Sequence, residues 1–147
     1  MRGIVAAITK DHIRKPDLPP LLSFLSNTSI SLFETIQKLL PAALDIENCE
    51  ERHALRIAIK KWRYFLEIVS RIMERDYGAV LEHLKKYQSL LGSMNDMTVF
   101  AAMCRKTGAP ADELAAAALM INDETKRLYD EFTALVEAEP LSYTFLI

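Results

Sequence analysis

Residues 52–64 read RHALRIAIKKWRY, and they carry most of the information about the fold and the site. The stretch holds five cationic residues and one histidine, and no acid occurs between Glu51 and Glu67. In an α-helix, which turns by about 100° per residue, the apolar positions share one broad face at core spacing. We therefore expect a helix that buries this face, which consists of Leu55, Ala58, Ile59, Trp62, Leu66 and Val69.

The basic residues of the same stretch form a row beside the expected core face. They fall within roughly a quarter of the helix circumference and extend along about 15 Å of helix. The predicted row consists of Arg52, Arg56, Lys60 and Arg63, with His53 at its margin. Such spacing matches an extended polyanion better than one small anion, because several phosphates can be neutralised together. The alternative is that the row is the solvated face of an ordinary amphipathic helix.

The composition favours a single all-helical domain. The chain has 147 residues, half of them hydrophobic, with only 4 Gly and 6 Pro. Long runs are rich in Ala, Leu, Glu and Lys, which are good helix formers. The formal net charge is -2, so any anion site must be local.

Nothing in the sequence predicts catalysis, a metal or a cofactor. The GxSxG, P-loop, HExxH and CxxC patterns are all missing, and the three histidines lie in separate segments. We expect a protein without enzymatic activity and without a cofactor. Cys49 and Cys104 lie far apart and are expected to be free thiols. No run reaches the ~18 apolar residues of a membrane helix, so we expect a soluble cytoplasmic protein.

Proline, glycine and charge positions divide the chain into expected helices. Residues 1–16 are expected to be a tail or the end of a preceding element, and residues 17–147 a helical domain. Gly92 is expected to end one helix, and Ser93 or Asn95 to cap the next. The last residues, 141–147, are apolar and are expected to dock on the bundle or on a partner. The expected architecture is all-α, an antiparallel bundle of four to five helices at 17–44, 45–75, 79–91, 93–105 and 111–139.

Two linked motifs carry a family resemblance. The first reads His53-x-x-Arg56-x-x-x-Lys60-x-x-Arg63-Tyr64-x-x-Glu67, and the second reads Leu84-Lys85-Lys86-x-Gln88-x-x-Leu91-Gly92-x-x-Asn95-Asp96. Together they resemble the CHAD family, the conserved histidine α-helical domain, over about residues 51–105. Family members usually carry two copies of the His-x-x-Arg helix in two bundles with pseudo-twofold symmetry. This sequence has one copy and resembles the C-terminal half of such a double bundle.

The resemblance implies a non-catalytic helical module that binds inorganic polyphosphate through a basic surface. It implies that His53, Arg56, Lys60 and Arg63 face the ligand, and that Lys85 and Lys86 contribute from the next helix. Arg52 is included because it belongs to the same predicted row. By the same resemblance, Tyr64, Gln88 and Asp96 are structural, and Asn95 caps a helix.

The partners implied by the resemblance are polyphosphate, a CYTH-type triphosphate-processing domain and polyphosphate granules as a location. A half-length match further suggests a homodimer or a separate second half. Two other readings of the function stay open. One is a structural bundle that mediates assembly, and the other is an accessory half of a triphosphate-processing enzyme. Nucleic acid is a weaker candidate, since no platform of exposed aromatic side chains is evident.

Overall fold

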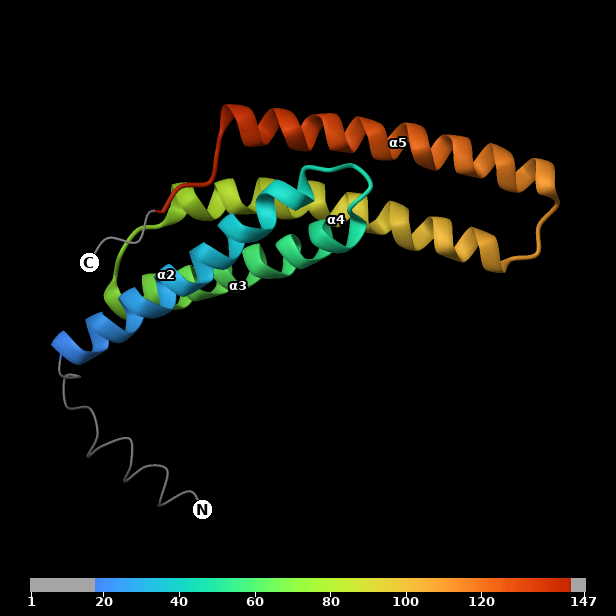
Figure 1. The fold of residues 1–147 in the computed structure, drawn as a ribbon. Coiled ribbons are helices and arrows are strands. Elements are labelled where there is room, and N and C mark those ends of the chain that lie inside the picture. The colour runs from blue at the N-terminus through green and yellow to red at the C-terminus, as the bar shows by residue number, and fades with distance from the viewer. Residues whose placement is uncertain (1–17, 144–147) are drawn as a thin grey trace, which may run out of the picture.

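The computed structural model describes residues 18–143, and within them it contains four helices and no strand. The helices are α2 (Leu18–Ala43), α3 (Cys49–Met73), α4 (Gly78–Lys106) and α5 (Ala111–Ala138). Each helix runs antiparallel to the preceding one and packs against it (Figure 1). The all-α antiparallel bundle is therefore confirmed, with α3 and α4 as the central pair. The expected segment 1–16 lies outside the described residues.

The core forms where α3 meets its neighbours. All six apolar positions predicted for the buried face of α3 are buried. Trp62 is 1% exposed, and its ring lies 5.7 Å from that of Phe33 on α2. On the other side, Tyr87 of α4 meets Phe132 of α5 edge to face at 6.2 Å. The helical period read from residues 52–64 thus identified the core face correctly.

Gly92 does not end a helix, which corrects one prediction. α4 runs without interruption from Gly78 to Lys106, and Asn95 lies inside it rather than at a cap. A Cβ atom at position 92 would lie 3.6 Å from Nε of Arg56, so the glycine faces α3 at close range. Buried Leu91 and Met94 on the same stretch anchor α4 in the core. This burial outweighs the roughly 1 kcal/mol by which glycine disfavours a helix.

The end of α5 is tied back to the start of α4. The backbone oxygen of Glu139 accepts hydrogen bonds from Nε2 of His83 at 2.7 Å and from the hydroxyl of Tyr87 at 2.8 Å. Leu141 then packs against the core, and the Tyr143 ring lies 5.6 Å from Phe33. Docking of the apolar tail on the bundle is confirmed as far as Tyr143. Residues 144–147 lie outside the described part of the chain.

The α4–α5 hairpin extends beyond the ends of α2 and α3 (Figure 1). Near its turn, at residues 107–110, several large apolar side chains are exposed. This hairpin tip consists of Val99, Phe100, Met103, Leu119 and Met120, which are between 50% and 73% exposed. Within residues 18–143, no helix is long and apolar enough to cross a membrane. Cys49 and Cys104 are free thiols, as expected.

Candidate anion-binding face

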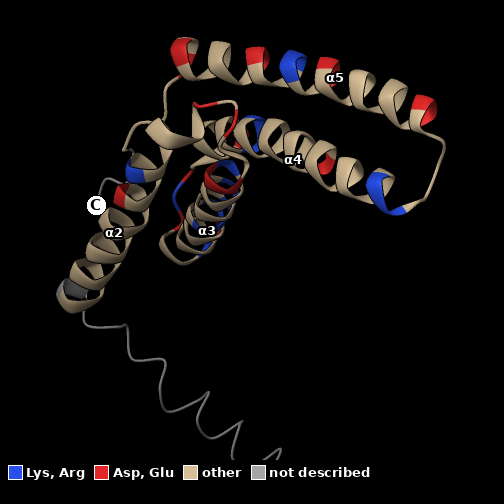
Figure 2. Ribbon diagram, turned by 45° about the vertical axis from the view of Figure 1, so that its right-hand side comes forward, with Lys and Arg blue, Asp and Glu red and all other residues tan. Residues whose placement is uncertain are grey.

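Four residues of the predicted row share one side of α3, next to the core face and alongside α4. His53 and Lys60 are exposed, while Arg56 and Arg63 are half-buried. We refer to these four side chains as the α3 face. The acidic residues of α3 are Glu50 and Glu51 in its first turn and Glu67 farther along. Figure 2 colours the charged residues on the ribbon.

α4 supports the α3 face at three successive positions. Nδ1 of His53 lies 3.1 Å from Oδ1 of Asn95, and Nη1 of Arg63 donates to Oε1 of Gln88 at 2.6 Å. Between these two contacts, Arg56 lies against Gly92. Because α3 and α4 are antiparallel, residue numbers that increase along α3 are matched by residue numbers that decrease along α4. The second motif of the sequence therefore supplies the supports for the first.

The contact between His53 and Asn95 fixes the orientation of the imidazole ring. An amide oxygen can only accept, so this contact requires a proton on Nδ1. Nε2 is then left outside this contact on an exposed side chain, and it can donate to a phosphate oxygen only when both ring nitrogens carry a proton. Sequence reasoning placed Asn95 at a helix end and missed this role. The signal that could have revealed it is the pairing of the two motifs, which places Asn95 opposite His53 once α3 and α4 are antiparallel.

Arg63 is the most restrained member of the α3 face. Its side chain is 21% exposed, and Nε lies 3.4 Å from Oε1 of Glu67 without forming a hydrogen bond. The guanidinium carbon lies 5.0 Å from the centre of the Tyr64 ring. Gln88, Glu67 and Tyr64 therefore hold this arginine in place. Its charge is partly compensated before any ligand arrives.

Arg56 and Lys60 carry the uncompensated charge of the face. Within residues 18–143, neither of them forms an ion pair. The ammonium group of Lys60 lies 5.6 Å from the centre of the Tyr64 ring, a contact that leaves its three donors available. These two side chains can bind an anion without first breaking an interaction with a carboxylate.

Arg52 does not join the face, although the sequence grouped it with the row. It is 4% exposed, and Nη1 donates to the backbone oxygen of Asp45 at 2.7 Å. Nη2 donates to Sγ of Cys49 at 3.4 Å. The turn before α3 leaves carbonyl oxygens without helical partners, and Arg52 in the first turn of α3 is positioned to satisfy one of them. Arg52 therefore supports the α2–α3 connection.

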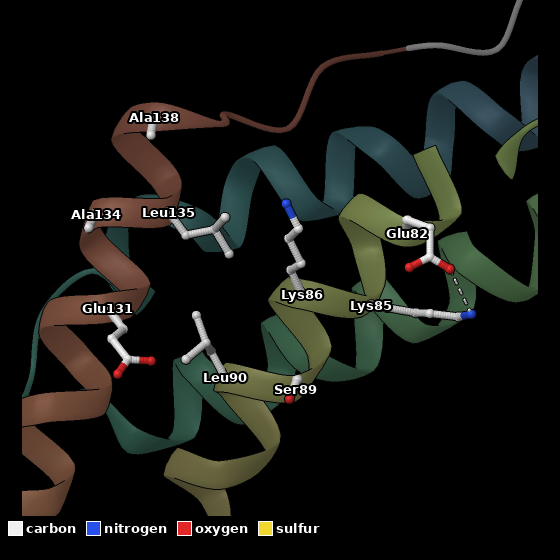
Figure 3. A pocket seen from close by; sticks show the side chains of 9 residues that line it. All are labelled: Glu82, Lys85, Lys86, Ser89, Leu90, Glu131, Ala134, Leu135 and Ala138. Atoms are coloured by element: carbon white, nitrogen blue, oxygen red, sulfur yellow. Dashed lines mark hydrogen bonds and ion pairs between the residues drawn. The ribbon is translucent and has the colours of Figure 1, made fainter. Parts of the chain in front are cut away.

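Lys85 and Lys86 are exposed side chains of α4, and each is paired with an acid. Both line a groove between α4 and α5, whose apolar floor includes Leu90 and Leu135 (Figure 3). Nζ of Lys86 is 3.1 Å from a carboxylate oxygen of Glu139, and Lys85 pairs with Glu82 at 3.2 Å. The side chain of Lys86 therefore lies toward α5 and not at the α3 face, contrary to the expectation. Both lysines are already paired with acids.

The shifted ionisable groups lie away from the α3 face. Burial and the nearby Glu139 carboxylate raise the pKa of Tyr87 to about 12, so this hydroxyl stays a donor. On the exposed side of α5, hydrogen bonding to Arg127 lowers the pKa of Glu124. No group of three or more His, Cys, Asp or Glu side chains in the described part of the chain could hold a metal ion.

Comparison with known families adds one finding. Residues 5–105 match the model of the CHAD domain family. The matched region includes α2, α3 and nearly all of α4, and it ends before α5 begins at Ala111. No curated protein and no solved structure was found to be similar to the chain.

Proposed function

Because the chain belongs to the CHAD domain family, we propose that it is a non-catalytic module that binds inorganic polyphosphate or a similar polyanion. The proposed ligand side chains are those of the α3 face: His53, Arg56, Lys60 and Arg63. The observation that carries the proposal is that Arg56 and Lys60, four residues apart on one helix, form no ion pair with any residue that the structure describes. The burial of Arg52 and the acid partners of Lys85 and Lys86 leave these three outside the proposed core of the site.

The proposed mechanism is electrostatic. Arginine can grip one phosphate with two parallel hydrogen bonds, and lysine adds a point charge beside it. Asn95 and Gln88 hold His53 and Arg63 in advance, so less side-chain freedom is lost on binding. A long chain of phosphates can touch the whole face at once. Orthophosphate can touch only one or two groups, and we expect it to bind far more weakly.

Calorimetric titration with long-chain polyphosphate tests this proposal. The variant Arg56→Ala/Lys60→Ala removes the two unpaired cations, and we expect its affinity to fall by about tenfold or more. The matched control is Lys38→Ala/Lys61→Ala, which removes two exposed charges, one from α2 and one from the side of α3 that faces α2. Equal affinities of the two double variants would identify the basic face as ordinary solvated surface.

A second candidate function is assembly with a second copy of the chain, favoured by the hairpin tip. Its exposed apolar side chains lie beside Arg105 and Lys106 at the end of α4, and Asp112 and Glu113 at the start of α5. A surface with both signs of charge around an apolar centre can complement itself about a twofold axis. This candidate and polyphosphate binding do not exclude each other.

A further inference from the structure

A hollow of about 610 Å³ lies where the α2–α3 turn meets α4 and α5. Its apolar wall includes Ile46, Met97 and Ile121. A hollow of this size is within the range of small-molecule sites, which reach from about 300 to 1,000 Å³. None of the four side chains of the α3 face lines it. It is therefore a separate surface feature.

Three cations from three helices line this hollow. They are Arg52 of α3, Arg105 of α4 and Lys126 of α5, whereas Glu47 is the one acid among the lining residues. Arg105 and Lys126 are exposed, and neither forms an ion pair with another described residue. The local charge of the lining therefore favours an anion with two negative charges.

Arg52 is a buried cation that no carboxylate of the described residues neutralises. Its side chain is only 4% exposed, yet its two hydrogen bonds reach a backbone oxygen and a sulfur atom, neither of them a carboxylate. Buried charged groups are normally paired with an opposite charge, because desolvation without compensation is costly. Among the described residues, no acid pairs with Arg52. An anion in the hollow would supply the counter-charge.

We propose that the hollow binds a small phosphomonoester, separately from the polyphosphate face. The phosphate dianion would lie among Arg52, Arg105 and Lys126, where the amide of Asn122 and the hydroxyl of Thr125 add donors. The hydroxyl of Thr98 is already engaged, since it donates to the backbone oxygen of Met94 at 3.3 Å. The organic part of the ligand would pack on the apolar wall.

Amide NMR of the labelled full chain, titrated with phenyl phosphate at low salt, tests the proposal. We expect saturable shifts at the amides of Asn122 and Thr125. The variant Arg105→Ala/Lys126→Ala should raise the dissociation constant by about tenfold or more, because it removes two charged contacts. Both side chains are exposed and form no ion pair within the described part of the chain, so the fold should tolerate their removal. Arg52 is kept, since it also holds the turn.

Two controls separate this site from general charge effects. Lys38→Ala/Lys106→Ala removes two exposed cations outside the hollow and should leave the dissociation constant within about twofold. Arg56→Ala/Lys60→Ala should also leave it unchanged, so either proposal can fail without the other. The proposal is overturned if wild type shows no saturable shifts at these amides, or if the Arg105/Lys126 variant binds equally well. Equal affinity for benzoate would overturn the assignment to a dianion.

Discussion

The salt dependence of polyphosphate binding follows from which cations of the α3 face are free. Among residues 18–143, Arg56 and Lys60 have no acid partner, and Arg63 is shared with Glu67 and Gln88. We therefore count three contacts with phosphate for this chain. For nucleic acids, each neutralised phosphate adds about 0.7 to 0.9 to the slope of log affinity against log salt. The same relation predicts a slope of roughly two to three here.

The variant Arg56→Ala/Lys60→Ala leaves His53 and Arg63 on the α3 face, and the charge of Arg63 is already partly compensated. A slope of roughly two to three means that wild-type affinity falls about 16- to 64-fold between 50 and 200 mM salt. With one remaining contact, the fall over the same range should be only about threefold. Lys38→Ala/Lys61→Ala should keep the wild-type slope, since it removes two exposed charges outside the α3 face.

Titration calorimetry with one long-chain polyphosphate at three or four salt concentrations measures these slopes. Circular dichroism should show the same helix content for all three proteins, because Arg56 and Lys60 lie off the buried stripe of α3. If the Arg56/Lys60 variant and wild type have the same slope, the contacts are elsewhere. If the control loses as much slope as the variant, only the general positive charge of the molecule matters.

Four further results are expected from packing, titration and exposure. Trp62→Ala should lower the free energy of unfolding by about 3–5 kcal/mol in urea denaturation, because the ring is buried. Gly92→Ala should instead raise the free energy of unfolding by up to about 1 kcal/mol, because alanine favours a helix more than glycine does. The added Cβ would lie 3.6 Å from Arg56, which is an ordinary contact distance. The folded-state pKa of Tyr87 is raised to about 12, so its contribution to stability is complete below the unfolded value near pH 10 and is lost as pH rises toward 12. Urea midpoints between pH 10 and 12 should fall more steeply for wild type than for Tyr87→Phe. Sedimentation velocity at micromolar concentration should show dimers that Phe100→Glu/Met103→Glu dissociates, and a monomeric wild type would exclude the hairpin tip as the interface.

The buried face of α3 could be predicted because a helix repeats its environment every turn. The spacing of Leu55, Ile59, Trp62 and Leu66 needs no knowledge of the neighbouring helices, and all four are buried. Gly92 shows the limit of such reasoning. Glycine is frequent at helix ends and also where two helices approach closely, and only the position of Arg56 on α3 distinguishes these cases.

Arg52 and Lys86 were misplaced for a related reason. Arg52 and Arg56 differ by only about 40° around the helix, so periodicity assigns both to one row. What separates them is the backbone oxygen of Asp45, which the turn brings within 2.7 Å of Arg52. Lys86 is turned toward α5, where Glu139 pairs with it. Both outcomes depend on a contact with a residue outside the helix in question, Asp45 for Arg52 and Glu139 for Lys86. The periodicity of a single helix does not reveal such contacts.

The net charge of -2 is compatible with a polyanion site because the charges are separated along the fold. α3 carries six basic and three acidic residues, whereas α5 carries two basic and seven acidic residues. α5 packs on α4 and makes no direct helix contact with α3, an arrangement visible in Figure 2. Exposed charges farther apart than about 10 Å are largely screened at 0.1 M salt. The potential at Arg56 and Lys60 is therefore set mainly by α3 and the adjoining side of α4, and the acids of α5 contribute to the total charge far more than to the site.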